Sequence, residues 1–323
     1  MKTRVLRTSA ATLAHTFEVG EEPTDSTTPV TVAVTDANGT AVTSGTAVSA
    51  GVDSGRYTFP LPGQALLGQL TVAWSATIAG AAVVQTDEVE IVGGFFFSLA
   101  QGRGSDSSLS DPAKYPATEL EVARLQTEEE CEAICDRAFV PRYARMVLDG
   151  TGESDLVLTH PGPERSLADV RSIRSVTMAP RADEAFTAFD TAELAALQVA
   201  DDGTLRRLDG ALFTRGYGNV VVELEYGLPA PSADLVRAAL TRFRTWLNVA
   251  RSGVPDRASS FTISDGGTYR LDMPGPFKTG IPPVDAAYAR YSRRDGAGGR
   301  KVPASRSLNF DPQFSSMFHG GRR

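Results

Sequence analysis

The sequence contains very little cysteine: Cys131 and Cys135 are the only two among 323 residues. Their spacing of four places both on one side of a helix, where a disulfide would strain the backbone. No third cysteine exists to complete a cysteine-based zinc site. We therefore expect no disulfide framework, and we expect both side chains to act as small apolar core residues in a reducing compartment.

Histidine is equally scarce, with only His15, His160 and His319, and none has a neighbour at metal-ligand spacing. The chain has neither a Gly-x-Ser-x-Gly nucleophile elbow nor a Walker-type phosphate loop. The glycine-rich segments 216–220 and 296–301 do not qualify, because the first precedes a strand and the second has the wrong spacing. We expect no enzyme, catalytic residue, metal or cofactor, although sequence alone cannot pair the many carboxylates into an acid–base couple.

Long apolar runs are also missing. No stretch approaches the ~20 apolar residues of a membrane span, and the first 15 residues lack the apolar segment of a secretory signal, so we expect neither membrane association nor export. The net charge is −7, but residues 293–323 carry seven basic and only two acidic side chains. The acidic remainder argues against tight, sequence-specific nucleic-acid binding, which depends on neutralisation of phosphates by Lys and Arg.

What is present divides the chain into parts, as expected at roughly 100–200 residues per domain. Residues 1–92 contain four runs rich in Val, Thr and aromatic residues, separated by turn signals, which predict an all-β sandwich. These runs are 29–36, 55–61, 69–78 and 81–92. Asp53, Gly55 and Tyr57 match the tyrosine corner of immunoglobulin domains, in which the phenol bonds to the backbone. The domain therefore resembles an immunoglobulin-like sandwich without its disulfide.

Residues 93–115, GGFFFSLAQGRGSDSSLSDPAKY, are rich in Gly and Ser and predict a flexible linker. We expect its three consecutive phenylalanines, Phe95, Phe96 and Phe97, to cover the base of the sandwich. On this interpretation the sandwich folds by itself and a hinge joins it to the next domain.

Residues 116–292 predict an α+β domain. A helix is expected over 118–137, with Thr118 and Glu121 at capping-box spacing and a run of glutamates on a solvated face. Residues 139–160 predict a strand pair around Gly150–Gly152. Further strands are expected at 170–178 and 219–226, a hairpin at 259–271, and a last helix that begins at Pro282 or Pro283. The best-defined helix follows Ser232, and its apolar face is wide enough for two neighbours.

Four stretches carry a resemblance to a known family: DPAKYPATELEVAR, RAFVPRYARMVLDG, VVVELEYGLPAPSADLVRAAL and TGIPPVDAAYARYSR. In this order, residues 111–292 resemble the head–tail connector, or adaptor, proteins of long-tailed double-stranded DNA phages, in the form found in phages of actinobacteria. The N-terminal sandwich lies outside the family's common core and resembles an added domain.

The resemblance implies a structural virion protein of the neck, assembled in the cytoplasm of the bacterial host. It implies a ring, normally a dodecamer, under the portal protein, with a downstream neck, stopper or tail-completion protein below and double-stranded DNA passing through without being read. For the added sandwich, which the resemblance does not cover, we expect a role outside the neck, either a contact with the capsid or decoration of the collar. Ring packing is expected to use the apolar face of the helix after Ser232: Leu235, Val236, Phe243, Trp246 and Leu247.

The chain closes on a basic segment, 293–323, that contains large apolar residues although no core lies nearby in the sequence. We expect an extended docking tail that binds the portal through aromatic anchors and arginines. The expected anchors are Leu308, Phe310, Phe314, Met317, Phe318, Arg322 and Arg323. The alternative left open is a tail that folds back over its own subunit.

Two other functional classes remain open from the sequence. A surface adhesin or glycan-binding module could be built on the sandwich, but it would need export. An enzyme with a carboxylate-only site would escape motif recognition. The genes beside this one separate the three hypotheses, since portal, protease and capsid genes would support a connector and a carbohydrate operon would contradict it.

Overall fold

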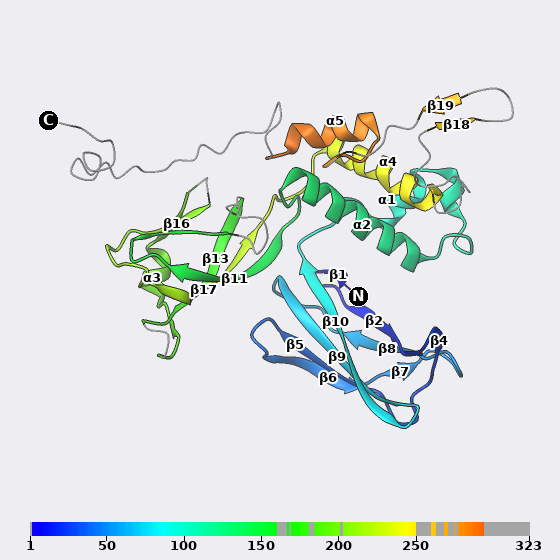
Figure 1. Cartoon of the computed structure of the whole chain (residues 1–323), viewed down its shortest axis with the longest axis horizontal. Coiled ribbons are helices and arrows are strands. Elements are labelled where there is room, and N and C mark those ends of the chain that lie inside the picture. Colours follow the sequence, from blue (N-terminus) through cyan, green and yellow to red (C-terminus); the bar gives the residue numbers. More distant parts are fainter. Residues whose placement is uncertain are drawn as a thin grey trace.

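The computed structural model describes residues 2–159, 167, 169–180, 184–200, 203–249, 260–262, 268–270, 275 and 277–293. Figure 1 shows a β-sandwich below, a layer of helices above it, and a second β-rich lobe to one side. Each of the three parts has its own buried apolar cluster. The expectation of a multi-domain, β-rich protein is confirmed.

The sandwich contains a five-stranded and a three-stranded sheet. The larger sheet has the order β1-β10-β9-β5-β6, formed by Lys2–Leu6, Ala81–Val92, Gly68–Ile78, Thr31–Asp36 and Ala41–Thr46. The smaller has the order β2-β8-β7, formed by Ala11–Thr16, Arg56–Leu61 and Val48–Ser49. The short strands β3 (Glu18–Val19) and β4 (Glu22–Pro23) pair beside them. Strand β1 runs parallel to β10, whereas the other pairs are antiparallel.

Tyr57 ties two loops of the sandwich together. Its hydroxyl accepts a hydrogen bond of 2.8 Å from the backbone N–H of Ser26, 31 residues upstream. The Asp25 carboxylate next to Ser26 accepts the N–H groups of Asp53 and Gly55 at 2.6 and 2.8 Å. The phenol thus bonds to backbone as expected, but to a different loop and not to the nearby residues that define a tyrosine corner.

The segment 93–115 is ordered, so the expected flexible linker is wrong. It contains α1 (Leu99–Gly104), whose N-cap Ser98 forms a capping box with Gln101, and the 3-10 helix η1 (Ser107–Ser110). Its apolar side chains enter the core of the helical layer, where Phe96 packs edge-to-face on Phe139 and Phe97 on Phe243. The phenylalanines therefore bind the helices and do not cover the sandwich, because burial against helices stabilises this segment more than its Gly and Ser content loosens it.

The helical layer consists of α2 (Ala117–Cys135), α4 (Ala233–Val249) and α5 (Pro282–Tyr291). Helix α5 begins at Pro282, as expected. Helix α2 begins after Pro116, which provides no side-chain cap, so the expected Thr118–Glu121 capping box is wrong: Thr118 already lies inside the first turn. Among the described residues, no helix has the length and apolarity needed to cross a lipid bilayer.

The β-rich lobe has a four-stranded sheet, β11-β17-β13-β14, and a three-stranded sheet, β12-β16-β15. The first comprises Arg142–Gly150, Gly216–Tyr226, Val170–Met178 and Thr187–Ala188, and the second Asp155–Val157, Thr204–Arg207 and Leu197–Val199. The short α3 (Thr191–Ala195) lies beside them, and β18 (Ser260–Thr262) pairs with β19 (Thr268–Arg270) as the expected hairpin.

The expected strand pair around Gly150–Gly152 does not form, because β11 pairs with β17 and β12 with β16. Asn219 explains why the chain leaves the first sheet at Gly150 and does not turn back into a hairpin. Its side chain accepts the N–H of Gly150 at 2.8 Å and donates to the carbonyls of Thr214 and Ala179. This occurs where the register of β11 shifts, so the strand ends in a bulge and the chain moves to the second sheet.

Candidate functional site: a charged joint between the domains

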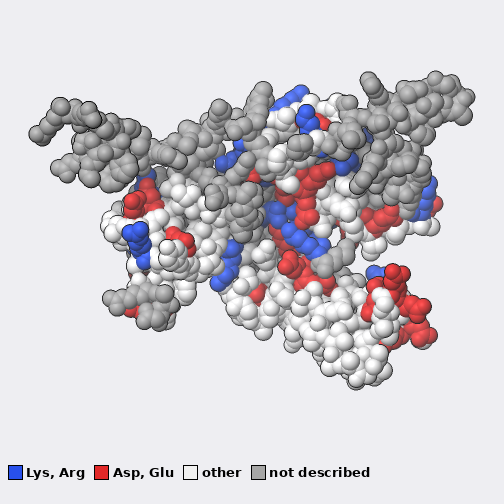
Figure 2. Space-filling model, in the orientation of Figure 1, with Lys and Arg blue, Asp and Glu red and all other residues white. Residues whose placement is uncertain are grey.

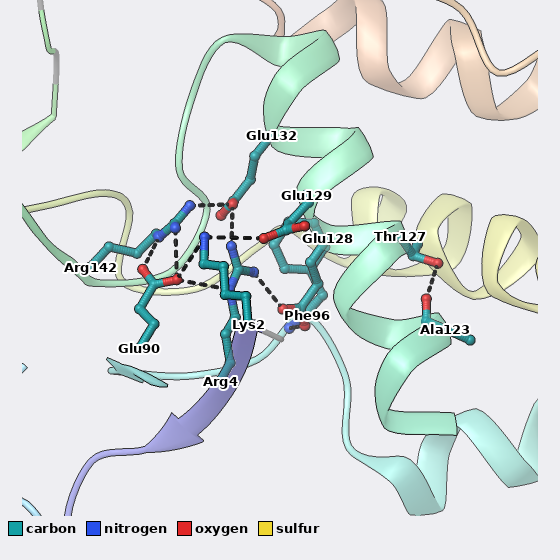
Figure 3. Close-up of polar contacts among 10 residues, drawn as sticks. All are labelled: Lys2, Arg4, Glu90, Phe96, Ala123, Thr127, Glu128, Glu129, Glu132 and Arg142. Atoms are coloured by element: carbon teal, nitrogen blue, oxygen red, sulfur yellow. Dashed lines mark hydrogen bonds and ion pairs between the residues drawn. The ribbon is translucent and has the colours of Figure 1, made fainter. Parts of the chain in front are cut away.

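Four segments meet where the sandwich contacts the rest of the protein: β1 and β10 of the sandwich, the middle of α2, and the start of β11. Figure 2 shows acidic and basic side chains gathered at this place, and Figure 3 shows their contacts. We call the cluster the joint network; its members are Lys2, Arg4, Glu90, Glu128, Glu129, Glu132 and Arg142.

Arg4 lies at the centre of the joint network. Its side chain is 2% exposed, and its guanidinium reaches three carboxylates. Nη1 donates to Glu128 at 2.8 Å, Nη2 to Glu132 at 2.8 Å, and Nε to Glu90 at 3.3 Å. Because Arg4 stands on β1 and the first two partners on α2, this one side chain fixes the N-terminal strand to the helical layer.

Arg142 makes the matching set of contacts from the lobe. Its Nε and Nη2 donate to the two oxygens of Glu90 at 2.5 and 2.8 Å, which is the bidentate arrangement that suits guanidinium and carboxylate best. Its Nη1 donates to Glu132 at 2.6 Å. Glu90 and Glu132 therefore each receive both arginines, and the sandwich, α2 and β11 share one set of charges.

The rim of the joint network balances its charge. Lys2 contacts Glu129 at 3.1 Å and Glu90 at 3.5 Å. Arg124 lies 3.6 Å above the ring of Phe95, and Glu128 also accepts the N–H of Phe96 at 2.9 Å. With Arg124 included, four cations face four carboxylates, so the buried charges compensate one another, as buried charges must.

The electrostatics of the joint network differ from one carboxylate to another. Burial acts to raise the pKa of Glu90, but Arg142 and Arg4 outweigh it and hold the pKa below its ordinary value. Burial prevails at Glu128, whose pKa is raised despite Arg4 and the Phe96 amide. Burial also acts to lower the pKa of Arg4 and Arg142, yet the surrounding carboxylates raise both, so the arginines stay charged at any physiological pH.

This arrangement is suited to holding segments together. Both arginines use their donors on carboxylates, and removing one partner would leave a buried charge uncompensated, which costs about 3–5 kcal/mol. Oε1 of Glu132 is buried without a hydrogen-bond partner among the described residues.

A second polar contact joins the sandwich to the lobe. The turn after β5 places Asn38 between two residues of the β11–β17 pair: its amide donates to Glu223 at 2.6 Å and its carbonyl accepts from Arg145 at 3.0 Å. Arg174 on β13 donates to the carbonyl of Leu67, just before β9, at 2.9 Å. Contacts at separate points resist rotation of one domain on the other.

The segment Phe139–Arg142 lies at the centre of the joint. The carbonyl of Pro141 accepts the N–H of Gly93 at 2.8 Å, and a Cβ on Gly93 would lie only 2.6 Å from the Pro141 ring. Gly227 turns the chain from β17 towards α4 at φ +97°, and a Cβ there would lie 2.3 Å from the carbonyl oxygen of Val140. The end of the sandwich and the turn before α4 both press against this one segment.

The residues expected to pack the ring lie mainly inside the subunit. Leu235, Phe243 and Leu247 are buried in the core of the helical layer, and Val236 packs against it. Only Trp246 is exposed, at 37%, with the guanidinium of Arg242 4.5 Å above its ring. A role in ring packing stays a prediction for Trp246.

The expected portal-binding residues lie outside the described part of the chain, as do His160 and His319. They are Leu308, Phe310, Phe314, Met317, Phe318, Arg322 and Arg323. Within the described residues, no group of three or more His, Cys, Asp or Glu side chains is placed to hold a metal ion. Cys131 and Cys135 are fully buried and free, with their sulfurs 4.0 Å apart.

The joint network was missed by the sequence analysis, and the expectation of a solvated glutamate run is wrong for two of its members. Glu128 is 0% and Glu132 8% exposed. One signal was available: residues four apart share a helix face, so two glutamates on one face of α2 require cations from elsewhere. Nothing in the sequence points to Arg4 and Arg142, which lie 124 and 10 residues away from their α2 partners.

Comparisons with known proteins add little to this description. No family model matches the chain, and no curated protein matches it. Among solved structures, the fold search finds CopC from Methylosinus trichosporium OB3b, at 17% identity and a TM-score of 0.22, covering 28% of this chain and 82% of that one.

Proposed function

We propose that the protein is a structural virion protein, a head-to-tail connector that forms a ring under the portal and extends the DNA channel. In this proposal the N-terminal sandwich is an immunoglobulin-like domain added to a connector body, and it contacts the capsid. The ring, a dodecamer in the connectors that the sequence resembles, carries the downstream neck proteins below it. No catalytic role, metal or cofactor is assigned.

The supporting observation is that the segments of the resemblance meet at one place. Phe139 packs edge-to-face on Tyr291 of α5 and on Phe96. The carbonyl of Ala138 accepts the N–H of Leu228, after β17, at 3.1 Å. Segments that are far apart in the sequence thus form one folded unit, which supports the proposal.

The rigid joint fits a load-bearing neck protein. A connector ring keeps its shape while a stiff, highly charged polymer passes through, so a domain attached to it must keep a fixed angle. Two arginines that each bind Glu90 and Glu132 provide such an attachment.

Exposed apolar residues of the lobe are candidates for contacts between subunits. Six large apolar side chains that are about half exposed or more come from this lobe: Val147, Val157, Phe186, Leu208, Leu212 and Tyr217. Exposed apolar side chains contribute to an interface where they adjoin one another, and a head-to-tail interface closes into a ring when its rotation permits.

The decisive experiment locates the protein in the virion. Antibodies against the sandwich should label the junction of head and tail in negatively stained particles, and cross-linking mass spectrometry should join lobe residues to the portal. Labelling at the tail tip, or absence of the protein from purified virions, would contradict the proposal. Purified protein should also bind duplex DNA weakly and release it at moderate salt. A channel that lets DNA pass without reading it needs few contacts between Lys or Arg and the phosphates, and salt screens such contacts.

A further inference from the structure

The smaller sheet of the sandwich has a free edge. In the described part of the chain, β2 pairs only with β8, so its other side has no strand partner. The N–H of Phe17 donates to the carbonyl of Gly55, so this pair is a hydrogen-bonded one. Hydrogen-bonded and non-hydrogen-bonded pairs alternate along an antiparallel ladder. The N–H and C=O groups of Thr12, Ala14 and Thr16 therefore point away from β8. Within the described part of the chain, these three residues present a row of donors and acceptors without a partner strand.

Edges of this kind are normally protected by lysine, proline or charge. The β2 sequence, ATLAHT, has neither lysine nor proline, and the ring of His15 is bound to Asp87 and Gln85 of β10. The edge strand β1 of the larger sheet, in contrast, carries Lys2 and Arg4. An unprotected edge invites the addition of another strand.

A cavity of about 420 Å³ lies beside this edge. It is bounded by Thr12, Ala14 and Thr16 on β2, and by α2 on the opposite side, where Val122 and Leu125 line it. Residues of the sandwich core, including Leu13, Val72 and Val89, also line it. Seven charged residues line it as well, among them Arg4, Arg56 and Asp87. The space thus has apolar positions beside charged ones, and an open strand edge for backbone.

Trp74, which also lines the cavity, carries a buried donor without an acceptor in the described part of the chain. Trp74 is fully buried, and its indole Nε1–H has no hydrogen-bond partner among the described residues. A buried donor without a partner costs about 1–3 kcal/mol.

The chain itself can supply the strand. The N–H of Arg293 bonds to the carbonyl of Cys135, which fixes the start of the C-terminal segment at the end of α2. From Cys135 back to Glu121, beside the cavity, α2 spans about 21 Å at 1.5 Å per residue. The ten residues 294–303 reach at most about 33–36 Å when extended, so residue 304 can lie at the β2 edge.

The sequence that follows has the required pattern. Residues 304–311, ASRSLNFD, lie between Pro303 and Pro312, and Leu308 and Phe310 alternate with polar residues. This period of two gives one apolar and one polar face. Eight residues suit the six of β2, and the two prolines limit the pairing at each end.

We infer that residues 304–311 of the same chain add to the free edge of β2, with Leu308 and Phe310 in the cavity against the sandwich core and α2. A tethered segment has a high effective concentration at its own subunit, which favours this over a second copy. The inference does not depend on the proposed function, and it leaves Phe314, Met317, Phe318 and the terminal arginines free to bind the portal.

Disulfide trapping tests the position of the segment. Ala14 is exposed on β2, and Asn309 lies on the polar face of 304–311, so their side chains should share the outer face of the sheet. In the full chain, Ala14→Cys with Asn309→Cys, or the same tail substitution with Thr12→Cys or Thr16→Cys, should form an intramolecular disulfide in at least one register. The two native cysteines are buried and should not compete.

The control pair, Ala14→Cys with Ser315→Cys, places the second cysteine beyond Pro312 and should cross-link much less. The inference is overturned if no register gives a cross-linked monomer. It is equally overturned if only cross-linked dimers appear, because the edge would then receive a second copy.

Hydrogen exchange tests the pairing without cysteines. The amides of Thr12, Ala14 and Thr16 should exchange roughly tenfold faster in a Leu308→Asp/Phe310→Asp variant than in the native chain, since the strand that protects them no longer docks. The matched variant Phe314→Asp/Met317→Asp carries the same charges beyond Pro312 and should leave the rates unchanged. Equal rates in all three proteins would refute the inference.

Discussion

Replacing Arg142 by methionine should be among the most destabilising changes in this protein. Methionine keeps much of the length of the side chain but removes the charge. The change deletes both hydrogen bonds to Glu90 and the bond to Glu132. Glu90 is 2% exposed and Glu132 8%, so neither carboxylate can recover its lost partner from water. We expect the free energy of unfolding to fall by about 3–5 kcal/mol, the cost of breaking a buried ion pair on one side.

The chain offers a matched control in the lobe. Arg206 also binds a carboxylate through two hydrogen bonds, to Asp155 at 2.8 Å each, but its side chain is 46% exposed. Water and salt screen such a pair, so Arg206→Met should cost only about 0.2–1 kcal/mol. Because both arginines bind a carboxylate through two hydrogen bonds, the difference between the two losses of unfolding free energy measures the effect of burial.

The assay follows the two domains separately during urea unfolding. The protein has two tryptophans, with Trp74 in the sandwich and Trp246 in the helical layer. In a Trp246→Phe background, Trp74 emission reports the sandwich, while far-ultraviolet circular dichroism reports the helices. The two transitions should coincide in the parent and separate in Arg142→Met, because the joint network couples the domains.

A further variant sharpens the test. Arg142→Met leaves the joint network with one more carboxylate than it has cations. Adding Glu90→Gln removes this excess charge, so the double variant should be more stable than the sum of the single changes by roughly 1–3 kcal/mol. The reasoning is refuted if Arg142→Met costs no more than Arg206→Met. It also fails if the domains already unfold independently in the parent.

Three further predictions follow from the structure. Acidification should have two opposed effects on the free energy of unfolding. The raised pKa of Glu128 means that the folded state takes up this proton before the unfolded state does, so the protein gains stability as the pH falls from neutral towards the ordinary pKa of 4.5. The lowered pKa of Glu90 means that the protein loses the stability from this carboxylate as the pH falls below 4.5. In pH-dependent unfolding, Glu128→Gln should abolish the first effect and Glu90→Gln the second, and an unchanged profile in either would contradict the assignment. Gly227→Ala should lower the free energy of unfolding by about 1–3 kcal/mol for the backbone strain and further through the clash of its Cβ with the Val140 carbonyl. Gly80→Ala, also at positive φ but in open space, should cost clearly less in the same thermal melts. If the proposed ring forms through the lobe, Tyr217→Asp should weaken assembly in mass photometry without lowering the melting temperature, since Tyr217 is 93% exposed on the lobe. Val52→Asp, at a residue 91% exposed on the sandwich, should leave assembly unchanged, and equal behaviour of the two variants would count against the lobe as the interface.

Much of the fold could be predicted because its signals are local. The runs that became β5, β8, β9 and β10 are rich in Val, Thr and aromatic residues, and Pro282 marks the start of α5. Such patterns are decided within a few residues, so one sequence suffices to read them. The pairing of β11 with β17 involves strands about 70 residues apart, and nothing local distinguishes it from the hairpin that was expected.

The candidate site was harder to predict than the fold, for a related reason. A glutamate in a helix is usually solvated, and only the tertiary structure shows that Glu128 and Glu132 face Arg4 and Arg142. The segment 93–115 misled in the same way: its Gly and Ser predict a linker, whereas its few apolar side chains, such as Phe97 and Leu109, decide its position by their burial. Composition describes the majority of residues in a segment, but packing is determined by the minority that become buried.

The use of charge at the joint carries a physical consequence. A joint of well-packed apolar side chains could be equally stable or more so, because buried ion pairs lose much of their Coulomb energy to desolvation. Apolar contacts, however, depend little on direction and tolerate sliding, whereas the guanidinium of Arg142 binds both oxygens of Glu90 only in one plane. Arg4 adds three further directions in the same space. Few relative orientations of the sandwich and α2 satisfy all these bonds at once, so the network selects one angle between the domains. Replacing Arg4, Glu90, Glu132 and Arg142 together by apolar residues, with Glu128→Gln to remove the charge that Arg4 would leave behind, should therefore preserve stability better than Arg142→Met alone. Small-angle scattering should then show a wider distribution of domain orientations; an unchanged distribution would mean that the second contact, through Asn38 and Arg174, sets the angle by itself.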